Sequence, residues 1–300
     1  MHTVTIEPFE TIYSWVTRIH RKRGSMDLAL TNRALFNQTS VHIHPYLPNQ
    51  LNSLAHSTRT DPNHLIRYHT LFPLFHYFVP LGDRFYNCMK FGRKPVARAL
   101  KLPSTGFSQA NHYRFCPVCA KEMRLSTGVV IIDIRHQLPG VEGCFKHACH
   151  LNSVETSKVF DRELLSPLTV SPINSCLPKT HAFSCFCTDF LSLAIETNSV
   201  FDLVVYKGEL ERQGFFNESG RLLVGKVGRA LLDFYDDLEL SQEIGNGFSI
   251  RSLSRLFNQQ HDYYIHPLFH MLLAFWLFDG DVQKFKWHDS KAGLIDLLDF

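Results

Sequence analysis

Four cysteine and histidine residues at fixed spacing constrain the fold of this 300-residue chain more strongly than its composition does. Cys116 and Cys119 form a CxxC pair, and Cys144 and His147 form a CxxH pair after 24 intervening residues. Structural zinc is commonly held in a tetrahedron by two such close pairs from two separate turns. The spacing therefore predicts one structural zinc site with these four side chains as ligands.

The identity of the fourth ligand stays open from the sequence alone. Cys149 and His150 lie beside the CxxH pair, and either could replace His147. Two unrelated sets of reactive or buried thiols would also give this pattern. Four protein ligands leave a zinc ion no open position for water or substrate, so the site is expected to stabilise the fold and not to catalyse.

Cys185 and Cys187 raise the question of a second zinc site, with Cys176 or His181 nearby. The CxC spacing fits a zinc knuckle poorly, and no clear second pair accompanies it. Buried thiols are the favoured interpretation of these residues, and a second metal site is the alternative.

The eight cysteines and the hydropathy pattern bear on the compartment. The sequence starts without a basic segment followed by an apolar one, and it contains no uncharged apolar run of about 20 residues. We expect a cytoplasmic protein without a membrane partner, in which cysteines serve as metal ligands and buried thiols because disulfides are rare in a reducing compartment.

Short helices are predicted throughout the first hundred residues. Residues 10–23 carry apolar side chains at helical spacing, and Gly24 ends the pattern. Three further helices are each expected to start at a capping or turn residue: Ser25, Pro48 and Asp61. A helix-turn-helix module produces this pattern, and so does any small helical bundle.

Charge is distributed unevenly along the chain. Residues 1–100 contain 12 Lys or Arg against 5 Asp or Glu, whereas residues 201–300 contain 10 against 15. The basic third includes a cluster that we take as the candidate nucleic-acid or partner surface: Arg18, Arg21, Lys22 and Arg23. The alternative is a solvated helix end whose cations stabilise the helix dipole.

The expected fold is mainly α with a small zinc-stabilised β unit. A β-branched run, VVIIDI at 129–134, is expected to be a strand of that unit. Helical spacing resumes later on one face of residues 222–234, where Leu222 and Leu223 start the pattern, and again at 266–280. We expect three regions: an N-terminal helical, helix-turn-helix-like region (1–102), a central zinc finger (103–190) and a C-terminal helical region (191–300).

The segment HTLFPLFHYF supplies five large apolar side chains: Leu71, Phe72, Leu74, Phe75 and Phe78. They are expected to be core, where the helical cluster meets the zinc unit, because large apolar residues are usually buried. If some were exposed, they would be the best candidate for a partner-binding patch.

Catalytic motifs are not supported by the sequence. GRLLVGKV at 220–227 approaches a phosphate-binding loop, but Val227 replaces the required hydroxyl and the spacing is helical. His266 and His270 lack the glutamate of a zinc protease, and Pro267 favours a helix start. The sequence therefore gives no reason to expect an enzyme.

Several segments together resemble the TniQ/TnsD family of transposon target-selection proteins. They occur in the family's order: an opening helix, RYHTLFPLFHYF (67–78), the CPVC knuckle, IRHQLPGVEGCFKHACHL (134–151), KGELERQGFFNESGRL (207–222) and HPLFHMLLAFWLF (266–278). The likeness runs over most of the chain. HTLFP together with the paired CxxC and CxxH motifs is quite specific.

The resemblance implies an adaptor of a prokaryotic cell that marks an insertion site and recruits an AAA+ ATPase transposition regulator. Target DNA would be reached through an RNA-guided CRISPR effector or, as the alternative, by autonomous sequence-specific binding to an attachment site. It also implies zinc at Cys116, Cys119, Cys144 and His147 and a helix-turn-helix in the N-terminal region. A homodimer is compatible with it.

This sequence departs from the family pattern in three places. Asp133, Ile134 and Arg135 stand where members often have Trp, and only Cys185 and Cys187 hint at the second knuckle of some relatives. Long members carry a further C-terminal DNA-binding extension, which this 300-residue sequence does not include. The absence of that extension favours the adaptor over autonomous DNA binding, which the motifs HTLFP and HPLFH, shared with the long members, keep open.

Overall fold

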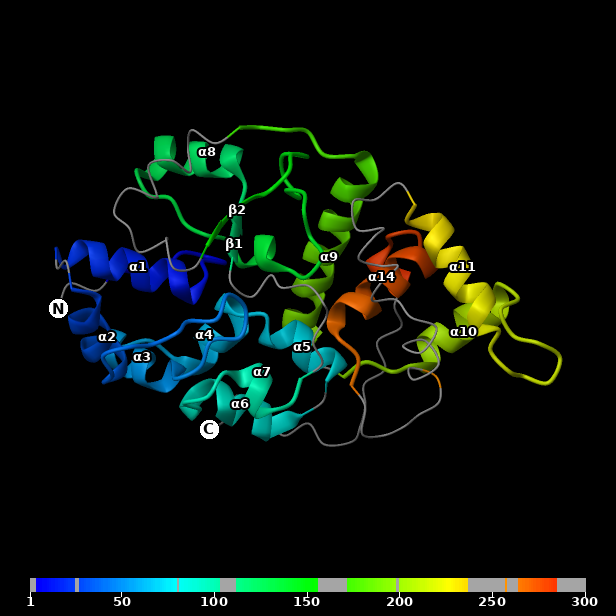
Figure 1. The fold of residues 1–300 in the computed structure, drawn as a ribbon, viewed down its shortest axis with the longest axis horizontal. Helices are drawn as coiled ribbons and strands as arrows, with labels where there is room; N and C mark the ends of the chain where they lie inside the picture. Colours follow the sequence, from blue (N-terminus) through cyan, green and yellow to red (C-terminus); the bar gives the residue numbers. More distant parts are fainter. Residues whose placement is uncertain are drawn as a thin grey trace.

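The structure is a computed structural model in which helices dominate and a single two-stranded sheet is described (Figure 1). The expected fold class, mainly α with a small β unit, is confirmed. The described residues are 4–24, 27–79, 81–102, 112–155, 172–197, 200–236, 257 and 264–284.

Seven helices precede the sheet in the described residues: α1 (Ile12–Lys22), α2 (Leu28–Phe36), α3 (Leu51–Thr58), α4 (Pro62–His69), α5 (Phe72–Phe78), α6 (Gly82–Phe91) and α7 (Val96–Ala99). Asp61 caps α4 as predicted, since its carboxylate accepts from the backbone N–H groups of Asn63 and His64.

The other two predicted helix starts differ from the structure. Ser25 lies outside the described residues, and the cap of α2 is Asp27, which accepts from Ala29 N. Helix α3 begins three residues after Pro48 and is preceded by Gln50 in a left-handed conformation. A proline was therefore a poor marker for this particular helix start.

Helix α1 is buried around most of its circumference, including polar positions. Trp15 and Val16 are almost inaccessible, and His20 Nδ1 lies 2.8 Å from the buried Thr31 hydroxyl on α2. The predicted amphipathic helix is therefore a core element. Helices α3 and α4 are joined by the three residues 59–61, the length typical of a helix-turn-helix connection.

The sheet pairs β1 (His112–Phe115) with β2 (Asn152–Glu155) in antiparallel register. The predicted strand at 129–134 is wrong. That segment packs against the start of α1, where Thr11 N donates to Ile132 O and Ile134 N donates to Phe9 O. Every second side chain of the segment is buried, so the pattern identified a buried extended segment and not a sheet strand.

The later elements are α8 (Pro117–Thr127), the 3₁₀ helix η2 (Ile134–Gln137), α9 (Pro178–Thr197), α10 (Val204–Arg212), α11 (Val224–Phe234), α14 (Pro267–Leu277) and the 3₁₀ helix η4 (Val282–Lys284). The predicted helical face was wrong at its start. Leu222 pairs with Phe216 in an isolated bridge, and Leu223 precedes α11. Val227 and Leu231 are its buried residues.

One connected core joins the N-terminal helices, the strand region and the C-terminal helices. Helix α5 packs on α9 and on α14, which also contact each other (Figure 1). The five predicted apolar side chains of the HTLFP segment are all buried, with exposed fractions of 7% or less, so their expected core role is confirmed. The core includes Val16, Tyr113, Phe190 and Leu272, so it draws on all three expected regions, whose boundaries stay a prediction.

None of the helices in the described part of the chain is long and apolar enough to cross a membrane.

Candidate metal centre

The first pair of the predicted ligands lies at the start of a helix. Strand β1 leads directly into Cys116, which is the N-cap of α8, and Pro117 occupies the first turn. The Cys119 backbone N–H donates to Cys116 Sγ over 3.3 Å. A helix N-terminus favours negative charge, so this position suits a thiolate.

The second pair lies in a tight loop. Gly143 and His150 form an isolated bridge, and Cys144 N donates to Cys149 O over 2.7 Å, which closes the loop around Cys144 and His147. A Cβ atom on Gly143 would lie 3.2 Å from the Ser184 hydroxyl. The absence of a side chain at position 143 therefore allows the loop to pack against α9.

The two-stranded sheet brings the two pairs together. Strand β1 ends at the first pair, and β2 begins just after the second loop, so their pairing places Cys116 beside that loop. Buried Arg114 on β1 also donates to Leu138 O over 2.8 Å, and Gln137 Nε2 donates to Arg114 O over 2.7 Å. These bonds fix the turn that leads into the second pair.

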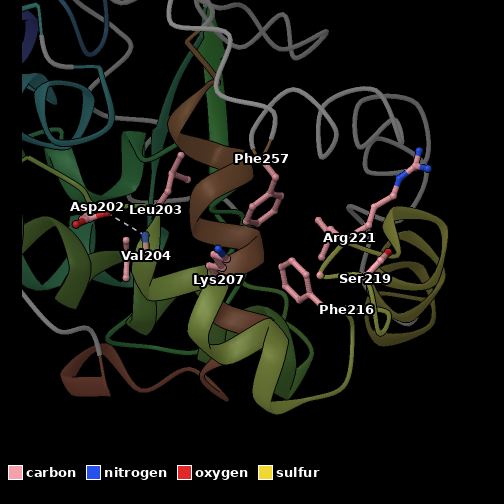
Figure 2. Close-up of a pocket in the computed structure, with 10 residues that line it drawn as sticks. Asp202, Leu203, Val204, Lys207, Phe216, Ser219, Arg221 and Phe257 are labelled. Carbon is pink, nitrogen blue, oxygen red and sulfur yellow. Dashed lines mark hydrogen bonds between the residues drawn. The ribbon is translucent and has the colours of Figure 1, made fainter.

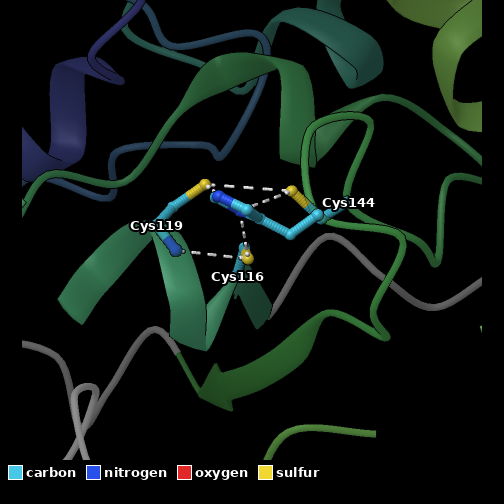
Figure 3. A group of neighbouring side chains, drawn as sticks. Cys116, Cys119 and Cys144 are labelled. Carbon is cyan, nitrogen blue, oxygen red and sulfur yellow. Dashed lines mark hydrogen bonds between the residues drawn. The ribbon is translucent and has the colours of Figure 1, made fainter. Parts of the chain in front are cut away.

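The four side chains converge on one point, as three labelled cysteines show in Figure 3. The ligand atoms of Cys116, Cys119, Cys144 and His147 all lie within 4.8 Å of one another. His147 Nδ1 is 3.5, 3.3 and 3.7 Å from the sulfurs of Cys116, Cys119 and Cys144, and the last two sulfurs are 3.8 Å apart. Ligands of a tetrahedral zinc, at bond lengths of about 2.1–2.3 Å, are separated by about 3.5–3.8 Å. The donor set therefore fits one zinc ion.

The geometry separates His147 from its sequence neighbours. Cys149 Sγ lies 3.5 Å from Cys116 Sγ, but Cys149 does not belong to the group of four mutually close ligand atoms. His150 is held in the bridge to Gly143. Of the three residues that the sequence offered for the fourth position, the structure brings His147 into the group.

Glu122 is a supporting residue that the sequence analysis missed. His147 Nε2 lies 3.1 Å from Glu122 Oε1, while its Nδ1 faces the sulfurs. A proton on Nε2, donated to the carboxylate, leaves Nδ1 free to bind a metal, as in many zinc sites. Glu122 lies three residues after Cys119 on α8, so its spacing in CPVCAKE was an available signal.

The three thiols share protons and do not ionise independently. Hydrogen bonding to the Cys119 side chain lowers the pKa of the Cys116 thiol. The reciprocal hydrogen bonds to Cys116 and Cys144 raise the pKa of the Cys119 thiol. A dication at the centre of the group would release the remaining protons, because thiolates and not thiols bind zinc.

Replacing Glu122 with Gln is expected to lower zinc affinity by about tenfold, the low end for a lost outer partner because this carboxylate is solvent-exposed. Competition against a chromophoric chelator measures the change. Lys146→Met, which removes the other partner of Glu122, is the matched control and should bind zinc like the wild type. Unchanged affinity in Glu122→Gln would show that His147 needs no orienting group.

Two of the residues proposed for a second metal site lie close together, since His181 Nε2 is 3.5 Å from Cys185 Sγ, but they form no group of three ligands in the described residues. His181 Nε2 and Cys185 Sγ both approach Phe145 O, at 3.0 and 3.4 Å, and Cys187 is buried in the main core. Among the described residues, one group of three or more potential ligands is close enough to share an ion: Cys116, Cys119, Cys144 and His147. The structure favours the buried-thiol interpretation.

The four cations of the predicted binding cluster occupy different environments. The side chain of Arg18 is 12% exposed and lies 2.6 Å from the carboxylate of fully buried Glu10. Burial raises the pKa of Glu10, and the positive charge of Arg18 counteracts this rise. Arg21 is half-buried, and burial lowers its pKa. Lys22 and Arg23 are exposed. Arg18 therefore neutralises a buried acid, and contacts of the cluster with a partner stay a prediction.

A pocket of about 450 Å³ lies between α10 and the turn before α11 (Figure 2). Asp202, Lys207 and Arg221 are its ionisable lining residues, and Phe216 and Phe257 contribute aromatic rings. In Figure 2 the Arg221 guanidinium lies on the far side of the pocket from Lys207.

Comparison with known proteins gives one family match. A family model described as TniQ matches residues 2–151, which is half of the chain and includes the four converging side chains. None of the curated proteins compared with the chain matches it significantly.

Proposed function

Because this chain belongs to the TniQ family of transposition target-selection proteins, we propose that it is an adaptor that links a target-DNA complex to an AAA+ ATPase transposition regulator. The target complex would be an RNA-guided CRISPR effector bound to its DNA. The convergence of three thiols and one imidazole inside the matched region is the observation that supports this proposal best.

The physical basis of an adaptor is a rigid body that presents two separate surfaces. The metal centre and the connected core supply the rigid body, since α5 packs on α9 and α14. The basic N-terminal third is the candidate surface toward nucleic acid, and the acidic C-terminal third is the candidate surface toward the ATPase. This division of surfaces follows from the charge pattern.

We infer that the chain acts by binding and not by turnover. The Cys3His group would surround one zinc ion with four protein ligands, which suits a structural site and leaves no position for a substrate. In this role, Cys116, Cys119, Cys144 and His147 would hold the ion and so stabilise the segment between β1 and β2.

Autonomous recognition of an attachment site is the second candidate, and the three-residue connection between α3 and α4 favours it. A sequence-specific protein binds its own site about 10³-fold or more tightly than random duplex, whereas an adaptor contacts duplex weakly. Binding to random and target-flanking duplexes at two salt concentrations separates the two functions.

Purification of the tagged chain from its native cells, with nucleic acid retained and sequenced, tests the proposed function. We expect the AAA+ ATPase and a guide RNA with effector subunits to co-purify. A single chromosomal locus without guide RNA would indicate direct recognition instead. Recovery of the folded chain with neither ATPase nor nucleic acid would contradict the adaptor function.

Reversing the charges of Lys22 and Arg23 to Glu is expected to reduce the recovered nucleic acid or partner several-fold, with the melting temperature nearly unchanged, whereas half-buried Arg21 is left in place. Lys22 and Arg23 are exposed, and surface charges contribute about 1 kcal/mol or less to stability. Equal recovery by this variant would exclude the cluster as a binding surface.

A further inference from the structure

A second, larger group of cations lies around α6 and α7. Residues 84–101 contain six Lys or Arg and no Asp or Glu, which is twice the net charge of +3 of the whole chain. These six residues, together with Phe91, define the α6–α7 face: Arg84, Lys90, Arg93, Lys94, Arg98 and Lys101. The sequence analysis did not single out this segment.

The side chains of the α6–α7 face are open to solvent. Five of its six cations are exposed; Lys90 is half-buried, with its ammonium 4.3 Å from the centre of the Tyr86 ring. Within the described part of the chain, none of the six forms an ion pair. Asp83 and Asp61 are the nearby acids, and Asp61 acts on Lys90 at longer range. The local charge is therefore strongly positive.

Phe91 is an exposed aromatic side chain on the same face. It is 61% exposed, and it lies seven residues after Arg84, hence on the same side of α6. Phe85 and Met89 are fully buried on the opposite side. One exposed apolar ring is ordinary on its own, so the cations and not the ring indicate a partner, and the ring is available to the same partner.

The backbone that carries these side chains is fixed. A Cβ atom on Gly92 would lie 2.4 Å from Cys88 O, so the tight exit from α6 requires glycine. The Asn49 side chain then donates to Lys94 O over 2.8 Å, which attaches the corner between α6 and α7 to the residues before α3. The cations are presented from a rigid corner, which reduces the entropy lost on binding.

Stabilisation of helix dipoles does not account for the arrangement. Lys90 lies in the last turn of α6, where a cation is favourable, but Arg84 lies in the first turn, where it is not. Arg98 lies in the last turn of α7, but this helix has only four residues and a weak dipole, and Lys101 lies beyond its end. Helix dipoles therefore account for Lys90 and in part for Arg98, but not for the other four cations.

We propose that the α6–α7 face binds the phosphate backbone of duplex DNA, with Phe91 packed against the sugars. Duplex DNA offers about one negative charge per 1.7 Å of helix axis, which a face of a single positive sign complements. This inference rests on the proposed function and assigns one of its surfaces.

Charge reversal at three positions tests the assignment. In fluorescence anisotropy with a short random-sequence duplex, the combined Arg93→Glu, Lys94→Glu and Arg98→Glu variant is expected to bind about tenfold or more weakly than wild type. The slope of log affinity against log salt should fall by about 3, one unit for each lost phosphate contact. The matched control combines Arg124→Glu, Arg221→Glu and Arg229→Glu, exposed residues elsewhere, and changes the net charge equally.

Preserved binding by the control together with loss in the α6–α7 variant supports the proposal. Equal loss in both variants, no duplex binding by wild type at low salt, or tighter binding of single-stranded DNA would overturn it. If the glutamate variant fails to fold, the same binding measurement is made on a variant with alanine at Arg93, Lys94 and Arg98. If the glutamate variant keeps duplex binding while the wild-type chain recovers the ATPase, only the assignment of the α6–α7 face is refuted. If the variant loses duplex binding but the wild-type chain recovers no ATPase, only the adaptor function is refuted.

Discussion

Replacing Cys144 with Ser is expected to abolish stoichiometric zinc binding and to unfold the segment between β1 and β2. Cys144 is fully buried in the loop that faces Cys116 and Cys119, and its sulfur is 3.8 Å from that of Cys119. Binding of a structural zinc contributes about 10 kcal/mol or more in small zinc domains. Losing one of four ligands should cost several kcal/mol, well above the effect of about 1 kcal/mol typical of a point mutation.

Elemental analysis, thermal unfolding and limited proteolysis measure this loss together. The expected result for Cys144→Ser is less than one zinc per chain, a lower melting temperature and cleavage within residues 116–151. Cys149→Ser is the matched control, because Cys149 is also buried beside Cys116 yet lies outside the group of four. Retained zinc in Cys144→Ser, or lost zinc in Cys149→Ser, would contradict the assignment of ligands.

Stability is expected to fall steeply as the pH drops below about 6.5, because four histidines, three of them buried and His44 half-buried, are held in neutral form. Burial lowers the pKa of His44 and His69 to about 4, and that of His266 and His270 to about 3. For two of these histidines, hydrogen bonds in the structure also require a neutral ring. His44 Nδ1 accepts from the backbone N–H groups of Tyr46 and Leu47, and His266 Nδ1 accepts from Leu268 N, so protonation would remove these bonds.

The sign and size of this effect follow from proton linkage. Between pH 6.5 and about 4, the unfolded chain binds protons on these four side chains and the folded chain does not, so lowering the pH favours unfolding. Each histidine contributes a slope of about 1.4 kcal/mol per pH unit in that window, and four contribute about 5.5. Above pH 6.5 these groups are neutral in both states and contribute no slope.

His270→Phe separates this effect from acid release of zinc. His270 stacks on Phe78 with ring centres 4.2 Å apart and is buried, so a phenyl ring suits its site. Urea unfolding at several pH values should show a slope reduced by about 1.4 kcal/mol per pH unit in this variant, with zinc content equal to wild type. An identical pH slope in the two proteins would contradict the role of buried His270.

The sequence predicted which four side chains converge, because each pair depends on short-range geometry. Cys116 and Cys119 are one helical turn apart, and Cys144 and His147 share one tight loop. The same local logic holds for two helix starts, α4 and α14, each of which has a proline in its first turn. Features that depend on neighbouring residues in the chain are therefore the ones that the sequence reveals.

The strands could not be predicted because nothing local marks them. β1 and β2 have four residues each and are separated by 36 residues, and neither shows a regular alternation of apolar and polar side chains. The run at 129–134 has the β-branched composition of a strand, yet its partner is the start of α1, where Ser14 Oγ accepts from Ile132 N. Tertiary contacts at long sequence separation decide both cases.

Arg18 shows the same limit for surface predictions. Its position in a basic cluster suggested a binding residue, but the buried carboxylate of Glu10 is eight residues away and within 2.6 Å. Glu122 shows the reverse case, since its spacing from Cys119 carried a usable signal. The α6–α7 face depended on the structure, because only burial shows which of its cations reach solvent.

Metal analysis of the purified full chain tests most directly whether a Cys3His zinc site stabilises this adaptor. Zinc is quantified by elemental analysis, and cobalt substitution reports the ligands through its absorption spectrum. We predict one zinc per chain and a tetrahedral cobalt spectrum with thiolate charge transfer, lost in Cys144→Ser. Metal-free protein that is as stable as the zinc-loaded form, and that still binds its ATPase, would contradict it.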